Sequence, residues 1–420
     1  MTSECYVYIT LPGQTEFVTA GRYQRQVDRN GVATGRFVYG RSYLAREAAV
    51  PLDPVELKLA EKIYETRSLN GMFGAIRDAS PDHWGRRIID RNFGSPGPGE
   101  LDYLLASPDD RAGALAFGLS QEPPAPRRNF NRTLDLIRLQ DFADAIIRNE
   151  DLPNEPDAQQ AQELMLDGTS MGGARPKAVV EDDNGLWVAK FNRPDDRWNH
   201  AKVERAMLEL ARQCGIQSAD SKLTTIGERD VLLVRRFDRT YTEQGYRRAR
   251  MLSALTLLRA EVAPDDRRNW SYILLVEELR RLSSQPKTDA RELFRRMCFN
   301  ALVTNNDDHP RNHAVIAMGE DWKLSPAYDL VPSMPVSDER RDLAMECGDA
   351  GRYANADNLR SQSARFLLEP DEARSIIDKM EQTVNAHWYE IARREGVSEQ
   401  DCETVRPAIA YRGFRLALNL

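Results

Sequence analysis

The sequence has few cysteines and no long hydrophobic run. No two cysteines form a CxxC pair, which excludes zinc knuckles and a disulfide framework and favours free thiols in a reducing cytoplasm. No apolar run reaches the roughly 18 residues that cross a bilayer, and residues 1–8 lack both parts of a signal peptide. We therefore expect a cytoplasmic chain with no membrane partner. The cysteines are Cys5, Cys214, Cys298, Cys347 and Cys402.

An excess of positive charge is also missing. The chain has 58 Lys and Arg against 65 Asp and Glu, so its net charge is −7. A general nucleic-acid binder usually carries a basic excess, which argues against direct binding to DNA. The apolar share of 41% and the charged share of 29% are ordinary for a globular protein. A length of 420 residues allows two or three structural units at roughly 100–200 residues each.

Runs rich in β-forming residues open the chain, and helical texture follows. Residues 6–9 and 35–39 predict strands within the first ~50 residues. Residues 54–92 predict helix, and a proline-rich break at 122–126 predicts a linker or long loop. Apolar residues recur with helical spacing over 133–148, which predicts another helix.

The middle of the chain predicts a hairpin, and the rest is mostly helical. Residues 177–180 and 186–191 flank an Asn-Gly turn, which favours a two-residue hairpin. Strands before helices indicate an α+β protein with two lobes. The remaining predicted elements are a helix over 200–213, strands over 221–226 and 231–235, and helices over 251–261, 270–282, 289–302 and 369–386.

The strongest local signal is a polar run, residues 304–313, directly after an apolar helix end. Asp307 and Asn312 stand five residues apart, as do the proton-accepting Asp and the metal-binding Asn of protein-kinase catalytic loops. A hairpin over residues 314–324 would return Asp329 toward Asn312. Carboxylate and amide oxygens are the ligands that Mg²⁺ prefers. The plain alternative is a capped loop, because Asp and Asn are common turn residues.

The same run contains two histidines four residues apart. His309 and His313 would bind zinc with Asp307 if the segment were helical. Pro310 disfavours such a helix, and no glutamate or cysteine completes a familiar ligand set. We expect satisfied loop histidines, and a zinc hydrolase stays as an alternative.

A glycine pair upstream suits a phosphate. Gly172 and Gly173 let backbone N–H groups approach an anion closely, although the segment is not a Walker loop and a flexible turn is the plain alternative. Lys190 on the next strand and Glu204 on the next helix follow the order of the kinase lysine and glutamate that orient ATP phosphates. The strand ending near Asp238 would serve as a hinge facing adenine and ribose, or would simply end in solvated charges.

Taken together, these motifs resemble the HipA family of serine/threonine kinases over nearly the whole chain. An RDxxPDxWGRR string and an NxDDHxRNH string in one sequence are hard to explain by chance. The matching segments are residues 71–74, 77–87, 172–177, 236–239, 252–258, 306–313 and 324–330.

The resemblance implies a two-lobed α+β fold of the protein-kinase type. Its parts would be a β-rich N-terminal subdomain over 1–122, an ATP-binding lobe over 123–240 and a helical catalytic lobe over 241–420. It implies ATP and Mg²⁺ as cofactors. Arg77 with Asp78 or Asp82 would form a buried ion pair in the N-terminal subdomain, with Trp84 in the core.

The resemblance also assigns the site residues. Asp307 would be the catalytic base, Asn312 and Asp329 the magnesium ligands, and Lys190 the partner of the ATP phosphates. Ser170 falls where family members carry an autophosphorylated serine. The other nucleotide-binding or supporting residues would be Gly172, Gly173, Ala174, Lys177, Glu204, Arg235, Phe237, Asp238 and His309.

Partners follow from the same resemblance. Family members act beside a HipB-type helix-turn-helix antitoxin, which would connect them to DNA indirectly, and several phosphorylate aminoacyl-tRNA synthetases. Pro176, Pro310 and Arg311 depart from the usual residues, so loop mobility and Ser170 autophosphorylation follow less directly. The alternatives are a small-molecule kinase with the same site and an inactive pseudokinase that acts as a corepressor with its antitoxin.

Overall fold

Segments far apart in the sequence combine into two units. One comprises Met1–Pro194, Leu233–Leu252 and Ile316–Asp321, and the other comprises Asp195–Leu232, Ser253–Val315 and Trp322–Leu420. The structure is a computed structural model. It describes residues 3–91, 97–128, 130–132, 136–148, 150, 173, 175–261, 267–334 and 337–418.

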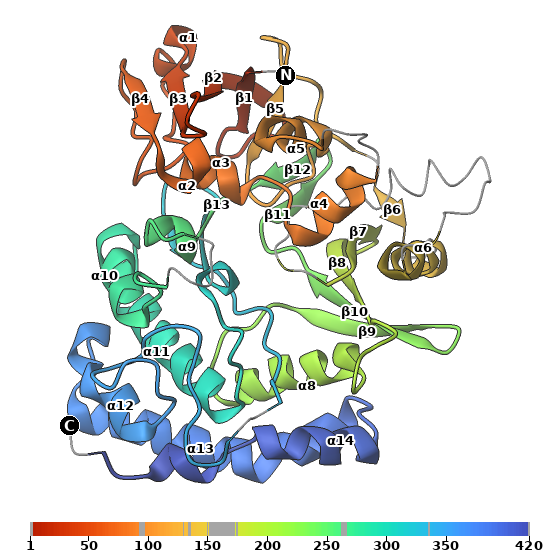
Figure 1. Cartoon of the computed structure of the whole chain (residues 1–420), viewed down its shortest axis with the longest axis vertical. Helices are drawn as coiled ribbons and strands as arrows, with labels where there is room; N and C mark the ends of the chain where they lie inside the picture. Colours follow the sequence, from red (N-terminus) through yellow and green to blue (C-terminus); the bar gives the residue numbers. More distant parts are fainter. Residues whose placement is uncertain are drawn as a thin grey trace. The chain divides into compact units, whose positions relative to one another are not determined.

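A five-stranded antiparallel sheet, in the order β4-β3-β2-β1-β5, forms the N-terminal part of the first unit (Figure 1). It confirms the strands predicted at the start of the chain. The helical prediction over 54–92 was wrong at β4, because Tyr64 pairs with Phe37 of β3, a long-range contact that local pattern does not reveal. The strands are β1 (Glu4–Thr10), β2 (Phe17–Val27), β3 (Ala33–Tyr39), β4 (Ile63–Thr66) and β5 (Leu115–Gly118).

Aromatic rings hold this sheet to its neighbouring segments. Phe37 and Tyr39 are two residues apart on β3 and meet edge to face, with ring centroids 4.8 Å apart. Tyr39 stacks on Tyr43 at 5.7 Å. Pairs of this kind add about 0.5–1.5 kcal/mol beyond burial.

Short helices and a small hairpin also belong to the first unit. Trp84 of α4 is buried, as predicted, and Arg77 pairs with Asp78 at 3.4 Å inside the unit. The helices are α1 (Arg41–Leu44), α2 (Ser68–Gly71), α3 (Gly74–Asp78), α4 (His83–Asp90), α5 (Glu100–Ala106) and α6 (Leu136–Arg148), and the hairpin is β11 (Arg239–Thr242) and β12 (Gly245–Arg248).

A second five-stranded sheet has the order β6-β7-β8-β10-β9. The predicted hairpin is confirmed, with Gly185 of the Asn-Gly turn at φ 121. Its register places Lys177 opposite Lys190, and directly opposed residues of antiparallel strands share a face. The strands are β6 (Asn131–Arg132), β7 (Lys177–Asp182), β8 (Gly185–Phe191), β9 (Ser221–Ile226) and β10 (Arg229–Arg235).

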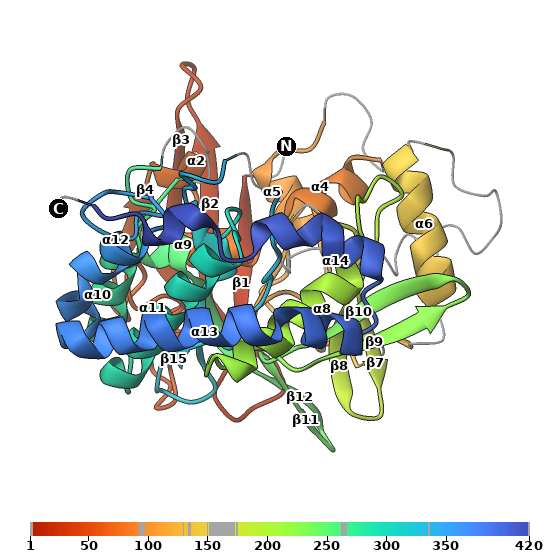
Figure 2. The ribbon, with the colours of Figure 1, turned by 90° about the horizontal axis from the view of Figure 1, so that it is seen from below.

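Helices dominate the second unit, as predicted. The long helix α13 packs along α8 and α11 (Figure 2), and Phe294 of α11 meets Phe366 with ring centroids 5.3 Å apart. None of the helices in the described residues is long and apolar enough to cross a membrane. The helices are α8 (His200–Gln213), α9 (Ala254–Leu257), α10 (Tyr272–Leu282), α11 (Pro286–Leu302), α12 (Ala356–Ser361), α13 (Pro370–Arg394) and α14 (Glu399–Val405), with 3-10 turns at Pro310–Asn312, Ser363–Phe366, Arg406–Ala408 and Arg412–Arg415.

The helix predicted over 251–261 was largely wrong. Its first residues form β13 (Arg250–Ser253), and only the single turn of α9 is helical. Strand β13 lies in a three-stranded sheet beside β14 (Ala314–Ala317) and β15 (Lys323–Leu324). Pairing with a strand some sixty residues away overrode the local helical pattern.

Candidate active site

The polar run follows directly after helix α11, whose C-terminal half from Arg296 to Leu302 is buried. Its Arg296 donates two hydrogen bonds inside the core, one from Nε to Glu292 Oε1 at 3.0 Å and one from Nη2 to the Ser325 carbonyl at 2.6 Å. Thr304, just past the helix, has φ 53, and its hydroxyl donates to the Ala408 carbonyl at 2.5 Å. The polar residues that follow are therefore held by a rigid scaffold.

The backbone of the next turn sets Asp307 beside Asn312. The Asn312 side-chain amide donates to the Asp307 carbonyl at 3.1 Å, and the His309 N–H donates to the same carbonyl at 2.8 Å. Pro310 begins a 3-10 turn that ends at Asn312. Because its nitrogen is engaged, the side-chain oxygen of Asn312 is the atom that could bind a metal.

Asp329 belongs to the same neighbourhood. The strands β14 and β15 return the chain, and the Tyr328 hydroxyl then donates to the Arg311 carbonyl at 2.8 Å. Asp329 itself has φ 58, a left-handed conformation that costs an L-residue of this kind roughly 1–3 kcal/mol. Such strain persists where the surroundings enforce it, which is common at functional sites.

The pKa of Asp307 is raised above its usual range. Partial burial of the carboxylate raises the pKa because it disfavours the charged form, and the negative charge of Asp329 raises it further. His309 and Arg267 lower the pKa. The residue as a whole still reaches solvent. A raised pKa on a residue that still reaches solvent suits a group that accepts a proton from a substrate.

A buried polar chain behind the loop was not predicted from the sequence. His313 Nε2 lies 3.0 Å from Asp308 Oδ2, and the Tyr272 hydroxyl donates to the same oxygen. Asn300 donates to Tyr272 at 3.1 Å, and Asn305 donates to Asn300 at 3.1 Å. Asp308 and His313 stood in the predicted run, but nothing in the pattern pointed to Tyr272 on α10, which is distant in sequence.

The contacts of His313 bear on the alternative that His309 and His313 form a zinc site. His313 is buried, and its Nε2 is paired with Asp308. The Nδ1 atoms of His309 and His313 have no hydrogen-bond partner among the described residues, so the expectation of fully satisfied histidines is not met. Among the residues that the structure describes, no group of three His, Cys, Asp or Glu side chains is arranged to hold a metal ion by themselves. The Asp307, Asn312 and Asp329 set includes an amide and is of a different kind.

Lys190 and Glu204 lie on the predicted elements, in different units. Lys190 is half-buried on β8, and Glu204 is buried on α8. Their pairing stays a prediction. Ser170, Gly172 and Ala174 lie outside the described residues. Gly173 is described, and its φ of 91 requires a glycine.

The hinge strand ends in a buried ionic cluster rather than in solvated charges. Arg235 is exposed and Phe237 half-buried, but Asp238 is buried and bonds Arg236, Arg239 and the Gly113 N–H. Burial alone would raise the pKa of Asp238, but the two arginine charges lower it below its usual range. The assignment of Asp238 to a ribose stays a prediction.

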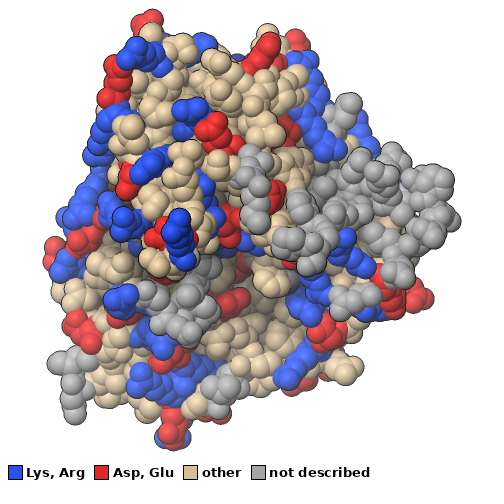
Figure 3. Space-filling view, turned by 45° about the horizontal axis from the view of Figure 1, so that its top comes forward, with Lys and Arg blue, Asp and Glu red and all other residues tan. Residues whose placement is uncertain are grey.

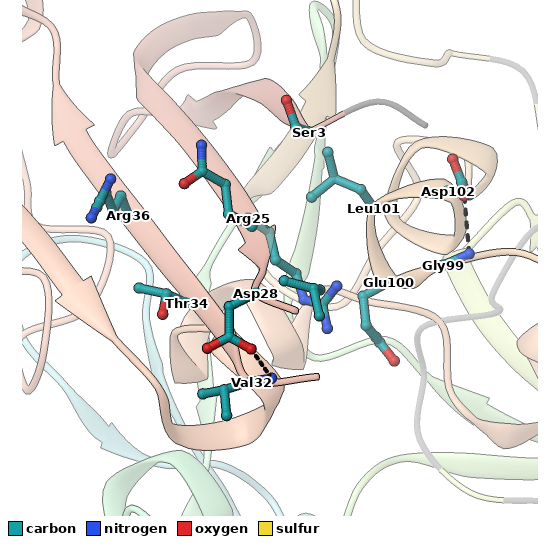
Figure 4. A pocket seen from close by; sticks show the side chains of 12 residues that line it. Ser3, Arg25, Asp28, Val32, Thr34, Arg36, Gly99, Glu100, Leu101 and Asp102 are labelled. Atoms are coloured by element: carbon teal, nitrogen blue, oxygen red, sulfur yellow. Dashed lines mark hydrogen bonds between the residues drawn. The ribbon is translucent and has the colours of Figure 1, made fainter. Parts of the chain in front are cut away.

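A cavity of about 550 Å³ on the first unit contains none of the predicted site residues (Figure 4). Its charged side chains already serve the fold. Asp28 and Asp102 accept backbone N–H groups, Arg25 donates to Asn70, Arg36 pairs with Glu65, and Glu100 pairs with Arg86. We therefore assign the cavity no role in catalysis.

Two family models cover most of the chain. The HipA-like C-terminal domain matches residues 169–388, and the HipA N-terminal domain matches residues 19–118. The chain belongs to the HipA family. Its HipA-like C-terminal domain contains the loop with Asp307, Asn312 and Asp329.

Solved and curated proteins agree with this membership. In the structure of the Shewanella oneidensis MR-1 HipA, HipB and operator DNA complex, a chain superposes with a TM-score of 0.70 at 18% identity, covering 96% of this chain and 94% of that one. The predicted HipA-type α+β fold is thereby confirmed. A Sinorhizobium fredii protein named "Putative kinase Y4mE" is 25% identical over 76% of this chain and 77% of its own length. A "Putative kinase" of Haemophilus influenzae is 24% identical over 45% and 57%.

The donor set fits magnesium. Asp307 and Asp329 are close enough for each charge to affect the other, and Asn312 adds an amide oxygen. Two neighbouring carboxylates repel until a cation joins them, and Mg²⁺ prefers such oxygen ligands.

Proposed function

We propose that the chain is an ATP- and Mg²⁺-dependent serine/threonine protein kinase. The observation that carries the proposal is the loop in which Asp307, with its raised pKa, neighbours Asp329 and is bonded through its carbonyl to Asn312. Asn312 and Asp329 would hold the metal, which would neutralise phosphate charge during phosphoryl transfer. Asp307 orients the substrate hydroxyl and accepts its proton.

The nucleotide would lie against the first unit's β-hairpin. We assign Lys190 to the ATP phosphates, the backbones of Arg235 and Phe237 to adenine, and Asp238 to the ribose. The glycine segment would bind the phosphates through backbone N–H groups. These assignments rest on the resemblance, and the remaining assigned residues are Ser170, Gly172, Gly173, Ala174, Glu204 and His309.

The proposed partner is a HipB-like antitoxin, and the proposed substrate is a protein of translation such as an aminoacyl-tRNA synthetase. The Shewanella HipA is seen with HipB and operator DNA, which supports the first proposal. DNA contact would be indirect, since basic and acidic side chains are interspersed on the face in Figure 3. We place the protein in the cytoplasm because all five cysteines are free thiols.

The variant Asp307→Gln tests the chemistry. It keeps a polar side chain, one methylene longer, but removes the proton acceptor, so we expect phosphate transfer to fall by at least about 10²-fold with the fold intact. The measurement is transfer from labelled ATP to proteins of a cell lysate, followed by phosphoproteomics of wild-type and variant. Full activity in the purified variant would refute the role of Asp307.

Two further readouts separate the alternatives. A metabolite panel labelled in place of the lysate would identify a small-molecule kinase with the same site. An intact mass of the wild-type protein raised by one phosphate, and not raised in Ser170→Ala, would establish autophosphorylation at Ser170.

A further inference from the structure

The RDxxPDxWGRR string, which the family match left without a role, forms the start of α4 and touches the glycine segment through one lysine. Asp82 Oδ2 lies 2.9 Å from Lys177 Nζ, and both side chains are 3% exposed. The same ammonium group donates to the Gly173 carbonyl at 3.1 Å. A charge-assisted bond that is excluded from water is stronger than a surface ion pair.

Asp82 both pairs with Lys177 and caps helix α4. Its other oxygen accepts the Gly85 N–H at 2.8 Å and so caps helix α4, which fixes the side chain in place. The Trp84 indole then donates to the Lys177 carbonyl at 3.2 Å. Helix α4 and its N-cap Asp82 therefore hold both the backbone and the ammonium group of Lys177.

The hairpin register explains why Lys177 needs this partner. Lys177 is directly opposite Lys190, and like charges in that position repel. The Asp82 carboxylate offsets the charge of Lys177. It also directs the Lys177 ammonium group to Gly173.

Helix α4 also contacts the chain on the other side of the undescribed segment 151–172. Arg87 donates to the carbonyls of Ile146 and Ile147 at 2.8 and 3.0 Å, and Arg91 donates to the Glu150 carbonyl at 2.5 Å. Carbonyls that precede this segment thus bond to Arg87 and Arg91, while Gly173, which follows it, is connected to α4 among the described residues only through Lys177 and Asp82.

We infer that Asp82 and Lys177 are positioning residues that hold the backbone of Gly173, one of the residues assigned to the ATP phosphates, near the start of helix α4. The inference rests on the proposed function, because it takes ATP as the ligand of Gly173. Neither side chain touches the nucleotide in this account. Each acts through the backbone of Gly173.

Asp82→Asn tests the inference with the helix cap preserved, because asparagine caps as well as aspartate. We expect the Kd for Mg-ATP, measured by calorimetry well below the unfolding temperature, to rise by about tenfold or more. Hydrogen exchange of residues 173–177 without nucleotide should accelerate by a similar factor, since an anchoring bond is lost.

Glu100→Gln is the matched control. Glu100 pairs with Arg86 of the same helix at 2.5 Å but contacts neither Lys177 nor Gly173 in the structure. It should lower the unfolding temperature without changing the Kd or the exchange at 173–177. Equal losses of affinity in Glu100→Gln and Asp82→Asn would overturn the positioning role.

A double variant guards against simple misfolding. Asp82→Asn alone leaves a buried lysine charge, whereas Asp82→Asn with Lys177→Met removes both charges and should recover stability. It still lacks a donor for the Gly173 carbonyl, so its affinity for Mg-ATP should stay low. Wild-type affinity in the double variant would overturn the inference.

The two readouts keep this inference apart from the proposed function. A wild-type protein that binds no Mg-ATP would refute the proposed function, and hydrogen exchange then decides the anchoring alone. Unchanged exchange at 173–177 in Asp82→Asn would overturn the inference whether or not ATP binds.

Discussion

Asp53 illustrates at the residue scale how burial changes chemistry. Its Oδ1 accepts the N–H groups of Val55 and Glu56 at 2.6 and 3.2 Å, while its buried Oδ2 has no hydrogen-bond partner among the described residues. Burial raises the pKa of Asp53 to about 7, against the lowering effect of those two bonds. The carboxyl therefore titrates near neutral pH in the folded protein.

This pKa predicts a pH dependence of stability. The folded protein binds a proton more tightly than the unfolded chain, so the stabilisation from Asp53 is complete below about pH 4 and is lost as pH rises through about 7. Between pH 5 and 8 the free energy of unfolding should fall by about 2–3 kcal/mol from this group. Asp53→Asn should remove that part of the slope in urea titrations at each pH.

Asp28→Asn is the control for this prediction. Asp28 accepts the N–H groups of Asn30 and Val32 in a similar turn but is exposed. Its replacement should leave the slope unchanged. A wild-type slope in Asp53→Asn would contradict the pKa.

The residue scale also shows what a single spacing can predict. The proximity of Asp307 and Asn312 could be predicted from their spacing, because residues five positions apart in a short loop stay close in space. The bond of Lys177 to Asp82 was not, since the two are 95 positions apart. From the sequence, Arg77 was expected to pair with Asp78 or Asp82, and it pairs with Asp78.

The β7–β8 hairpin is the element on which the opposed lysines depend. Gly185 at φ 121 closes its turn, and a side chain there is strained although nothing crowds it. Gly185→Ala should lower the free energy of unfolding by about 1–2 kcal/mol. Because a loosened turn also loosens the register at Lys177, the Kd for Mg-ATP should rise modestly.

Gly319→Ala supplies the comparison for Gly185. Gly319 lies in the connection between β14 and β15, has open space around it and no left-handed backbone. It should be nearly neutral in thermal melts. A loss of stability equal to that of Gly185→Ala would show that backbone strain at Gly185 is not the cause.

Elements differ in how far local sequence predicts them. The helix at 200–213 and the Asn-Gly hairpin carry their own signals and were confirmed. Strand β13 carries none, because its pairing with β14 supplies the energy that its sequence does not. Strand β4 differs from its helical prediction for the same reason.

At the scale of the whole molecule, ligand binding should stabilise the folded state. If Asn312 and Asp329 hold magnesium, Mg-ATP at about 100 times its Kd adds about 2.7 kcal/mol to the free energy of unfolding. A thermal-shift titration should show a clear rise in Tm for wild-type protein. Asp329→Asn should abolish most of that rise, because it removes a charged metal ligand.

ATP with EDTA is the control for the shift. It supplies the nucleotide without the metal and should give little stabilisation in either protein. A wild-type protein that shows no shift with Mg-ATP would favour the pseudokinase alternative. An unchanged shift in Asp329→Asn would remove Asp329 from the metal site.

The sequence by itself determined the family, the α+β class and the polar loop, because these depend on residue type and on spacing over a few positions. Only the tertiary structure decided which distant groups meet: Tyr272 with Asp308, Gly113 with Asp238, and Lys177 with Asp82. Burial makes such pairings strong by excluding water. It depends on the packing of the whole chain, which local pattern does not contain.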